Sequence, residues 1–155
     1  MAKAIRANQE FFDILAGDIF ARLYTHFPEP IDIYANGIWY NEEFEKSEFY
    51  DDDADRIMKL YAHTVQWLSN EGFLRFSQAI GDSSDGDEGF LNCILTSKGL
   101  AALRKTPDSL VGPGETLGDK IEAAAKDIGS DSAKATMKQL VGAALGWIAR
   151  SVTGI

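Results

Sequence analysis

Histidine and cysteine, the side chains that most often act as nucleophiles or general bases near neutral pH, are scarce in this chain. It holds two histidines, His26 and His63, and one cysteine, Cys93. Neither histidine has a serine or cysteine partner at a recognisable catalytic spacing. Cys93 falls on the apolar alternation of a predicted strand, which favours a small buried side chain. One cysteine and two scattered histidines also make no zinc site. We therefore expect no catalytic residues and no enzyme activity.

Two loops have the residue types of ligand-binding motifs but not their spacing. Residues 82–87 are acidic like a calcium loop, yet their oxygen ligands are spaced differently, and Cys93 occupies the twelfth position in place of glutamate. Residues 112–120 are glycine-rich like a phosphate-binding loop. In that stretch an aspartate separates the last glycine from the lysine, and no hydroxyl residue follows the lysine. The sequence therefore predicts no metal and no cofactor.

Acidic side chains are concentrated in two short segments. The chain has 24 acidic and 15 basic residues and a net charge of −9. Residues 41–55 contain a single base, Lys46, and residues 82–88 contain none. Two interpretations stay open: a surface that binds a partner, or solvated loops beside a helix start that favours acids. The candidate partner-binding acidic surface comprises Glu42, Glu43, Glu45, Glu48, Asp51, Asp52, Asp53, Asp55, Asp82, Asp85, Asp87 and Glu88.

The composition indicates a folded, soluble protein with one ordinary core. Hydrophobic residues make up 45% and charged residues 25% of the 155 residues. No uncharged apolar stretch reaches about 18 residues, so we expect no segment that spans a bilayer. No apolar run follows Lys3 and Arg6, as it would in a secretory signal. The single cysteine fits a reducing compartment, and we expect a cytoplasmic protein.

The N-terminal half predicts two long helices separated by an extended segment. Apolar residues recur at spacings of three and four from Asn8 to His26, with Asn8 as the cap of that helix. Residues 29–34 are predicted to be extended because proline disfavours helix before it. A short helix is expected from about Asn41. A second long helix is predicted at about 52–71, and Gly72 fits the left-handed position after its end.

A β-hairpin and a short helix are predicted next. The hairpin runs from Phe73 to Leu95, because apolar residues alternate on both sides of a polar, glycine-rich loop at 81–89. Thr96 has the residue type of a helix cap, which predicts a helix at 97–104. Pro107 is expected to end this helix.

The C-terminal tail predicts two more helices after a linker at 107–115, at about 116–128 and 132–152. The last helix is too apolar to stand alone in water, and it has two glycines four residues apart that would let another backbone approach closely. We expect the tail to pack on its own domain or in a homodimer, and not on a membrane, because its polar face is not strongly basic. The candidate contact residues are Leu140, Gly142, Leu145, Gly146, Trp147 and Ile148.

The order of these elements resembles the winged-helix superfamily. Residues 67–74 (WLSNEGFL) are similar to a third helix that ends at a glycine and leads into the first wing strand. Residues 95–103 (LTSKGLAAL) are similar to the second wing strand and the helix after it. The resemblance covers about residues 8–105. It implies an α+β, mostly helical fold, with a winged-helix domain of three helices and a hairpin wing at 8–106 and a helical extension at 116–155.

The sequence departs from DNA-binding members of this superfamily in two places. The region of the second helix is stretched over residues 31–50, and it is rich in acids and aromatics. The acidic segments at 42–55 and 82–88 occupy the positions that a DNA-binding relative would turn toward phosphate. Close approach would cost Coulomb repulsion and release no counterions. Duplex binding by the usual winged-helix face is therefore disfavoured.

Three functions remain open at this point. The first is a non-enzymatic protein–protein interaction module or accessory factor that uses the winged-helix fold without reading DNA. The second is a transcription regulator that binds DNA through an unusual face or through a partner. The third is an acidic inhibitor or immunity-type protein that neutralises a basic partner by electrostatic steering.

Overall fold

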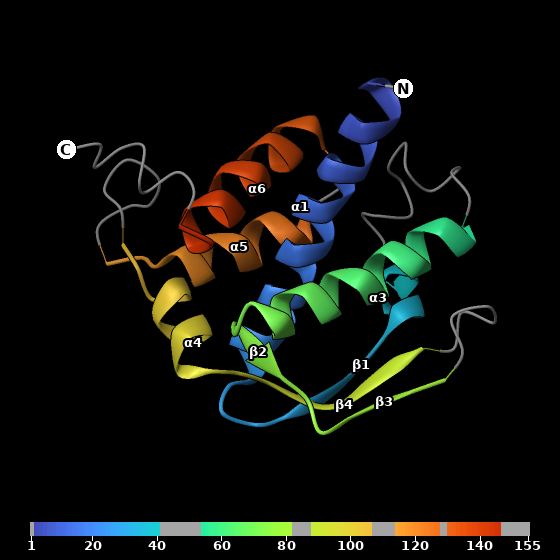
Figure 1. The fold of residues 1–155 in the computed structure, drawn as a ribbon. Helices are drawn as coiled ribbons and strands as arrows, with labels where there is room; N and C mark the ends of the chain where they lie inside the picture. Colours follow the sequence, from blue (N-terminus) through green and yellow to red (C-terminus); the bar gives the residue numbers. More distant parts are fainter. Residues whose placement is uncertain (1, 41–53, 82–87, 107–113, 128–129, 147–155) are drawn as a thin grey trace.

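Figure 1 shows the computed structural model, which describes residues 2–40, 54–81, 88–106, 114–127 and 130–146. In these residues the chain is mostly helical, with a small antiparallel sheet, and the helices lie on one side of that sheet. The predicted α+β, mostly helical class is confirmed.

Helix α1 (Ala2–His26) forms the centre of the core. Its apolar stripe, including Phe11, Leu15 and Ile19, is fully buried, as the spacing predicts. The predicted start at Asn8 is wrong, because the helix begins six residues earlier at Ala2. Asn8 is therefore an internal helical residue, and its side-chain oxygen accepts a hydrogen bond from Arg56 instead of capping the helix. A residue of capping type has no capping role when the helix continues on both sides.

The sheet has β4 (Gly89–Leu95) at its centre. Strand β1 (Ile31–Tyr34) pairs with β4 on one side, and β2 (Leu74–Arg75) and β3 (Gln78–Ile80) pair with it on the other, all antiparallel. This pairing confirms the predicted hairpin and, over Ile31–Tyr34, the predicted extended segment at 29–34; Glu29 instead lies in the turn after α1, where its amide donates to the His26 carbonyl. A bulge interrupts the β1–β4 register, and Asn92 adopts the left-handed conformation there, with φ of 57°.

A 3-10 helix, η1 (Ala35–Tyr40), follows β1, and helix α3 (Ala54–Asn70) leads into β2. The short helix expected from about Asn41 lies outside the described residues. Gly72 ends α3 in the predicted left-handed conformation, with φ of +85°. The Phe73 amide then donates to the Leu68 carbonyl, so the turn satisfies one of the last helical acceptors.

Three further helices follow the sheet, and each is preceded by a residue whose side chain caps it. Helix α4 (Ser97–Leu103) is capped by Thr96, as predicted. Helix α5 (Leu117–Lys126) begins with a reciprocal capping box between Thr116 and Asp119, and helix α6 (Asp131–Ala144) is capped by Ser130.

Helices α5 and α6 pack directly against α1, so the described part of the tail shares one core with the rest of the chain. The contact is close at two glycines. A Cβ on Gly17 would lie 2.3 Å from the sulfur of Met137, and one on Gly118 would lie 2.6 Å from the ring of Tyr24. Because glycine has no side chain, α6 packs closely on α1 at Gly17, and α5 packs closely on α1 at Gly118.

The predicted end of the last helix, near Val152, is wrong. Helix α6 ends at Ala144, Leu145 is its C-cap, and Gly146 follows with φ of +88°. Gly146 therefore ends the helix, and a Cβ at this position would have nothing within 4 Å. The apolar pattern continues past this point, but a left-handed glycine after the cap stops the helix irrespective of the pattern.

Candidate functional site

Most of the candidate acidic surface lies outside the described residues. This applies to Glu42, Glu43, Glu45, Glu48, Asp51, Asp52, Asp53, Asp82, Asp85 and Asp87. Asp55 falls in the first turn of α3, and Glu88 is half-buried immediately before β4. The structure therefore describes the residues that flank most of the two acidic segments.

The anchors of the two acidic segments adjoin one another. The amide of Ala35, at the start of η1, donates to the carbonyl of Glu88 over 2.8 Å. Tyr34 is the register partner of Gly89, and its ring lies over that glycine, where a Cβ would come within 2.5 Å of it. Figure 1 shows η1, the start of α3, the end of β3 and the start of β4 at one end of the molecule. The described residues that flank 41–53 and 82–87 thus lie at that end, which we call the acidic end.

Helix α3 presents a polar face of a different character. Lys59, His63, Gln66 and Asn70 are exposed at helical spacings of three and four, and residues 56–70 contain no acid. Hydrogen-bond donors are therefore abundant on this face.

An aromatic pair borders the polar face of α3. Trp67 is 36% exposed, and its ring contacts the ring of Phe12 edge-on, with the centroids 5.3 Å apart. Packing of this kind fixes the indole while leaving part of it in solvent.

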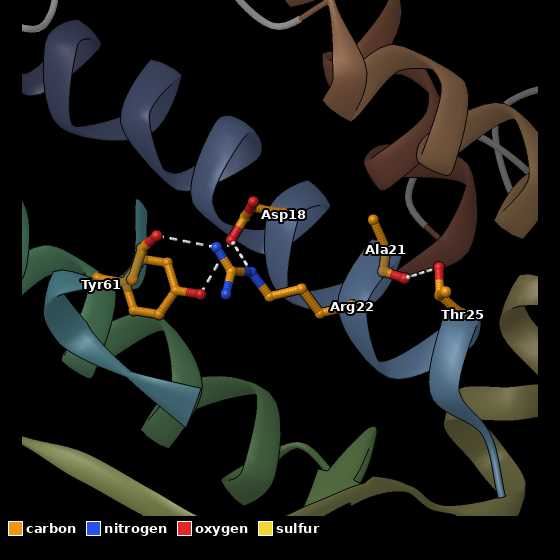
Figure 2. A network of polar contacts seen from close by, with 6 residues as sticks. Asp18, Ala21, Arg22, Thr25 and Tyr61 are labelled. Carbon is orange, nitrogen blue, oxygen red and sulfur yellow. Dashed lines mark hydrogen bonds and ion pairs between the residues drawn. The ribbon is translucent and has the colours of Figure 1, made fainter. Parts of the chain in front are cut away.

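Beneath these surfaces lies a buried polar network, shown in Figure 2, that joins three elements. Asp18 of α1 accepts hydrogen bonds from the Nε of Arg22 over 2.8 Å and from the hydroxyl of Tyr61 over 2.9 Å. Arg22 also donates to the carbonyl of Gly37 in η1 over 3.0 Å. The network therefore ties α1 to α3 and to the 3-10 helix that precedes the first acidic segment.

Burial controls the protonation of this network. It raises the pKa of the Asp18 carboxyl, although the charge of Arg22 and the hydrogen bonds from Tyr61 and Arg22 act in the opposite direction. Burial and the neighbouring carboxylate also raise the pKa of the Tyr61 hydroxyl, which therefore stays protonated and donates. Partial burial lowers the pKa of Arg22, but the charges of Asp18 and Tyr61 and the hydrogen bond to Asp18 together outweigh it, and the net change is upward.

Perturbed titration marks catalytic sites as well as structural networks. Asp18 is 4% exposed, and its two partners are the fully buried Tyr61 and the Arg22 side chain, which is 34% exposed. We assign Asp18, Arg22 and Tyr61 a positioning role for η1. The spacing of Asp18 and Arg22, four residues apart inside an apolar helix, was the sequence signal for an internal ion pair.

The two histidines and the cysteine, whose side chains could act in catalysis, have different surroundings. His26 and His63 are exposed. Cys93 is fully buried as predicted, its thiol donates to the Phe90 carbonyl, and burial raises its pKa to about 12. Within the described ranges no group of three histidine, cysteine, aspartate or glutamate side chains is arranged to hold a metal ion. No helix of that part is long and apolar enough to cross a membrane.

The candidate tail contacts divide into three groups. Leu140 and Gly142 are buried in the core of their own chain, and Leu145 is half-buried against it. Gly146 ends α6 in the left-handed conformation, and a Cβ there would have no described atom within 4 Å, so the described part of the chain does not pack on it; its predicted role as a dimer contact stays a prediction. Trp147 and Ile148 lie outside the described residues.

Comparison with known proteins finds no matching family model, no matching curated protein and no matching solved structure.

Proposed function

We propose that this chain is a non-enzymatic winged-helix protein whose acidic end binds a basic protein partner. The order α1, β1, η1, α3, hairpin and α4 supports the winged-helix part of the proposal. The position of β4 between β1 on one side and β2 and β3 on the other also fits a helix bundle flanked by a small antiparallel sheet with a wing.

The observation that carries the functional part is the common anchoring of the two acidic segments. The bond from Ala35 to Glu88 and the pairing of Tyr34 with Gly89 join the end of one segment to the start of η1, the 3-10 helix that leads into the other segment. Twelve acidic side chains against one base belong to the two segments attached there. A concentration of one charge sign steers a partner of the opposite sign and suppresses like-charged partners.

An accessory factor and an inhibitor of a basic protein share this electrostatic requirement. Both bind a cationic surface, and both lose affinity as salt screens the attraction. The two functions differ in their effect on the partner: an inhibitor lowers the partner's activity in the complex, whereas an accessory factor does not.

Capture from an extract of the source cells tests the proposal. The triple variant Asp82→Asn, Asp85→Asn, Asp87→Asn removes three charges from the acidic end. A matched control, Glu29→Gln, Glu71→Gln, Glu122→Gln, removes three charges from the loop after α1, the end of α3 and helix α5.

We expect the wild-type chain and the control to retain the same basic protein, and the acidic-end variant to lose it. Raising the salt from about 50 to about 300 mM should release it from both, because the Debye length shortens. Identical capture by all three chains, or capture of acidic proteins alone, would refute the proposal.

A DNA-binding regulator is the second candidate, and the polar face of α3 favours it. Lys59, Gln66 and Asn70 are exposed on one helix without an intervening acid. These residue types donate to phosphates and to base edges in the major groove. Against this, phosphate near the acidic end would meet repulsion.

Alanine at Gln66 and Asn70 tests this second function. If α3 reads base edges, the double variant should weaken binding to a preferred duplex by about tenfold or more, because each good base contact discriminates by about 1–3 kcal/mol. If the chain binds a protein through its acidic end, capture of that protein should be unchanged by the same double variant.

A further inference from the structure

A second candidate site lies on the sheet face that the helices leave uncovered. There the surface is hollowed to a volume of about 280 Å³. Figure 1 shows the helices on the opposite side of the sheet. The lining residues are Pro30, Arg75, Phe76, Ser77, Asn92 and Ile94.

The pairing register places two of these residues side by side on the outer face. Leu74 pairs with Leu95, and both are buried against the helices. The next pair along the ladder is Arg75 with Ile94. Because successive side chains of a strand point to opposite faces, Arg75 and Ile94 project together into the hollow.

Apolar groups form its walls. Ile94 and Phe76 are half-buried, and Pro30 closes the side next to β1. The Phe76 ring contacts the ring of Phe90 edge-on, with centroids 5.0 Å apart, so it is held by a residue of the core. A concave apolar surface with few polar groups is the usual form of a small-molecule site.

The bulge in β4 fixes the two neutral polar groups of the lining. The side-chain amide nitrogen (Nδ2) of Asn92 donates to the Ser77 hydroxyl over 2.9 Å. That hydroxyl donates in turn to the Leu91 carbonyl over 3.2 Å. The Asn92 backbone amide donates to the Asp32 carboxylate over 3.0 Å. These bonds hold the hollow in shape before any ligand arrives, which lowers the cost of binding.

Arg75 supplies the remaining polar group. Its side chain is exposed, and its guanidinium makes no hydrogen bond or ion pair within the part of the chain that the structure describes. No carboxylate belongs to the lining itself, and the neighbouring Asp32 carboxylate, which accepts from the Asn92 backbone amide, makes no ion pair with Arg75 in the part of the chain that the structure describes. The hollow therefore combines apolar walls with one guanidinium group, that of Arg75, which is available to bind a ligand.

We propose that this hollow binds a small monocarboxylate with an aromatic or aliphatic body. The guanidinium fork pairs with the two carboxylate oxygens through charge-assisted hydrogen bonds, which a neutral group cannot match in strength. The body contacts Phe76, Ile94 and Pro30. A volume at the lower end of the range for ligand sites limits the occupant to a compact molecule.

This site is independent of the acidic end. Gly89, at the start of β4, adjoins the acidic segments, whereas Ile94 lies toward the other end of that strand. Failure of one proposal therefore leaves the other standing.

Titration of the ¹⁵N-labelled full-length chain with 3-phenylpropanoate tests the proposal, with 3-phenylpropanamide as the uncharged probe of the same shape. We expect amide shifts centred on Arg75, Phe76, Asn92 and Ile94. The carboxylate should bind about tenfold or more tightly than the amide, since hydrogen bonds to a charged group contribute about 1.5–3 kcal/mol. Arg75→Gln should abolish that preference, and Lys126→Gln on α5 should preserve it.

Three results would overturn it: equal affinity for acid and amide, shifts centred elsewhere, or none at millimolar ligand. Because Arg75 is exposed, its substitution is expected to leave the fold intact, and the circular dichroism spectrum checks this. Ile94→Trp, which fills the hollow, should prevent binding of both probes. If that variant fails to fold, the Arg75→Gln result alone decides.

Discussion

Gly99 is the residue at which the structure makes its sharpest prediction about stability. It lies in the first turn of α4, where a Cβ would be only 1.9 Å from the carbonyl oxygen of Phe73 and 3.2 Å from Leu95. The oxygen belongs to the backbone and cannot rotate away. Gly99→Ala therefore forces α4 and the start of β2 apart by about 1.5 Å to reach an ordinary contact distance.

That displacement damages a specific set of bonds. The Phe73 carbonyl accepts from the Thr96 amide over 3.1 Å, and the Thr96 hydroxyl caps α4 by accepting from the Gly99 amide over 3.1 Å. Overpacking costs about 1–3 kcal/mol, and the cap and the backbone bond each add about 1 kcal/mol. Alanine regains about 1 kcal/mol of helix propensity. We expect a net loss of about 2–4 kcal/mol.

Urea unfolding followed by circular dichroism measures this loss. Ala101→Gly, at an exposed position of the same helix, is the matched control and should cost about 1 kcal/mol through propensity alone. If Gly99→Ala leaves the free energy of unfolding unchanged or raises it, the close approach of α4 to Phe73 is refuted.

Three further outcomes are expected. Gly146→Ala and Gly146→Leu should both cost about 1–2 kcal/mol, since the strain lies in the left-handed backbone; a much larger loss for leucine in urea unfolding would indicate packing instead. The raised pKa of Asp18 means that its contribution to stability is full below its unfolded pKa of about 3.9 and is lost as pH rises through the folded value. The advantage of the wild-type chain over Asp18→Asn in the free energy of unfolding should thus shrink as the pH rises above about 4, and a constant difference would contradict the raised pKa. Cys93, with a pKa of about 12, should react with a thiol reagent at about pH 8 far more slowly in the native protein than in denaturant; equal rates would show that the thiol is accessible.

Local patterns predicted the elements whose cause is local. The apolar stripe of α1, the cap at Thr96 and the left-handed Gly72 each depend on residues a few positions apart, and the structure has all three. The hairpin was predictable for the same reason, because alternation and a polar loop specify two antiparallel strands.

The remaining features depend on contacts between distant residues. In the sequence pattern, Tyr61 is one more residue of the apolar face of α3. Only the packing of α3 on α1 brings its hydroxyl to Asp18. Arg75 and Ile94 share a face only because β2 pairs with β4 in one register. The end of α6 was missed because apolar periodicity continues beyond Gly146, although the conformation of that glycine stops the helix.

The adjoining anchors of the acidic segments could not be read from the sequence either. Segments 41–55 and 82–88 are separated by a helix and two strands, and the bond from Ala35 to Glu88 exists only in the folded sheet. Composition predicted the acidity of each segment, and the topology adds that both are attached to the same end.

Equilibrium binding of a fluorescent DNA duplex at physiological salt is the most direct test of the central claim that the acidic end selects a protein over nucleic acid. Fluorescence anisotropy of the duplex is followed as the wild-type chain is added at about 150 mM salt. We predict no saturable binding with a dissociation constant below about 1 μM, which is about the tightest value usual for non-specific DNA binding at this salt concentration. A submicromolar dissociation constant that weakens steeply as salt rises would show that phosphate contacts overcome the acidic end, and would assign the chain to DNA.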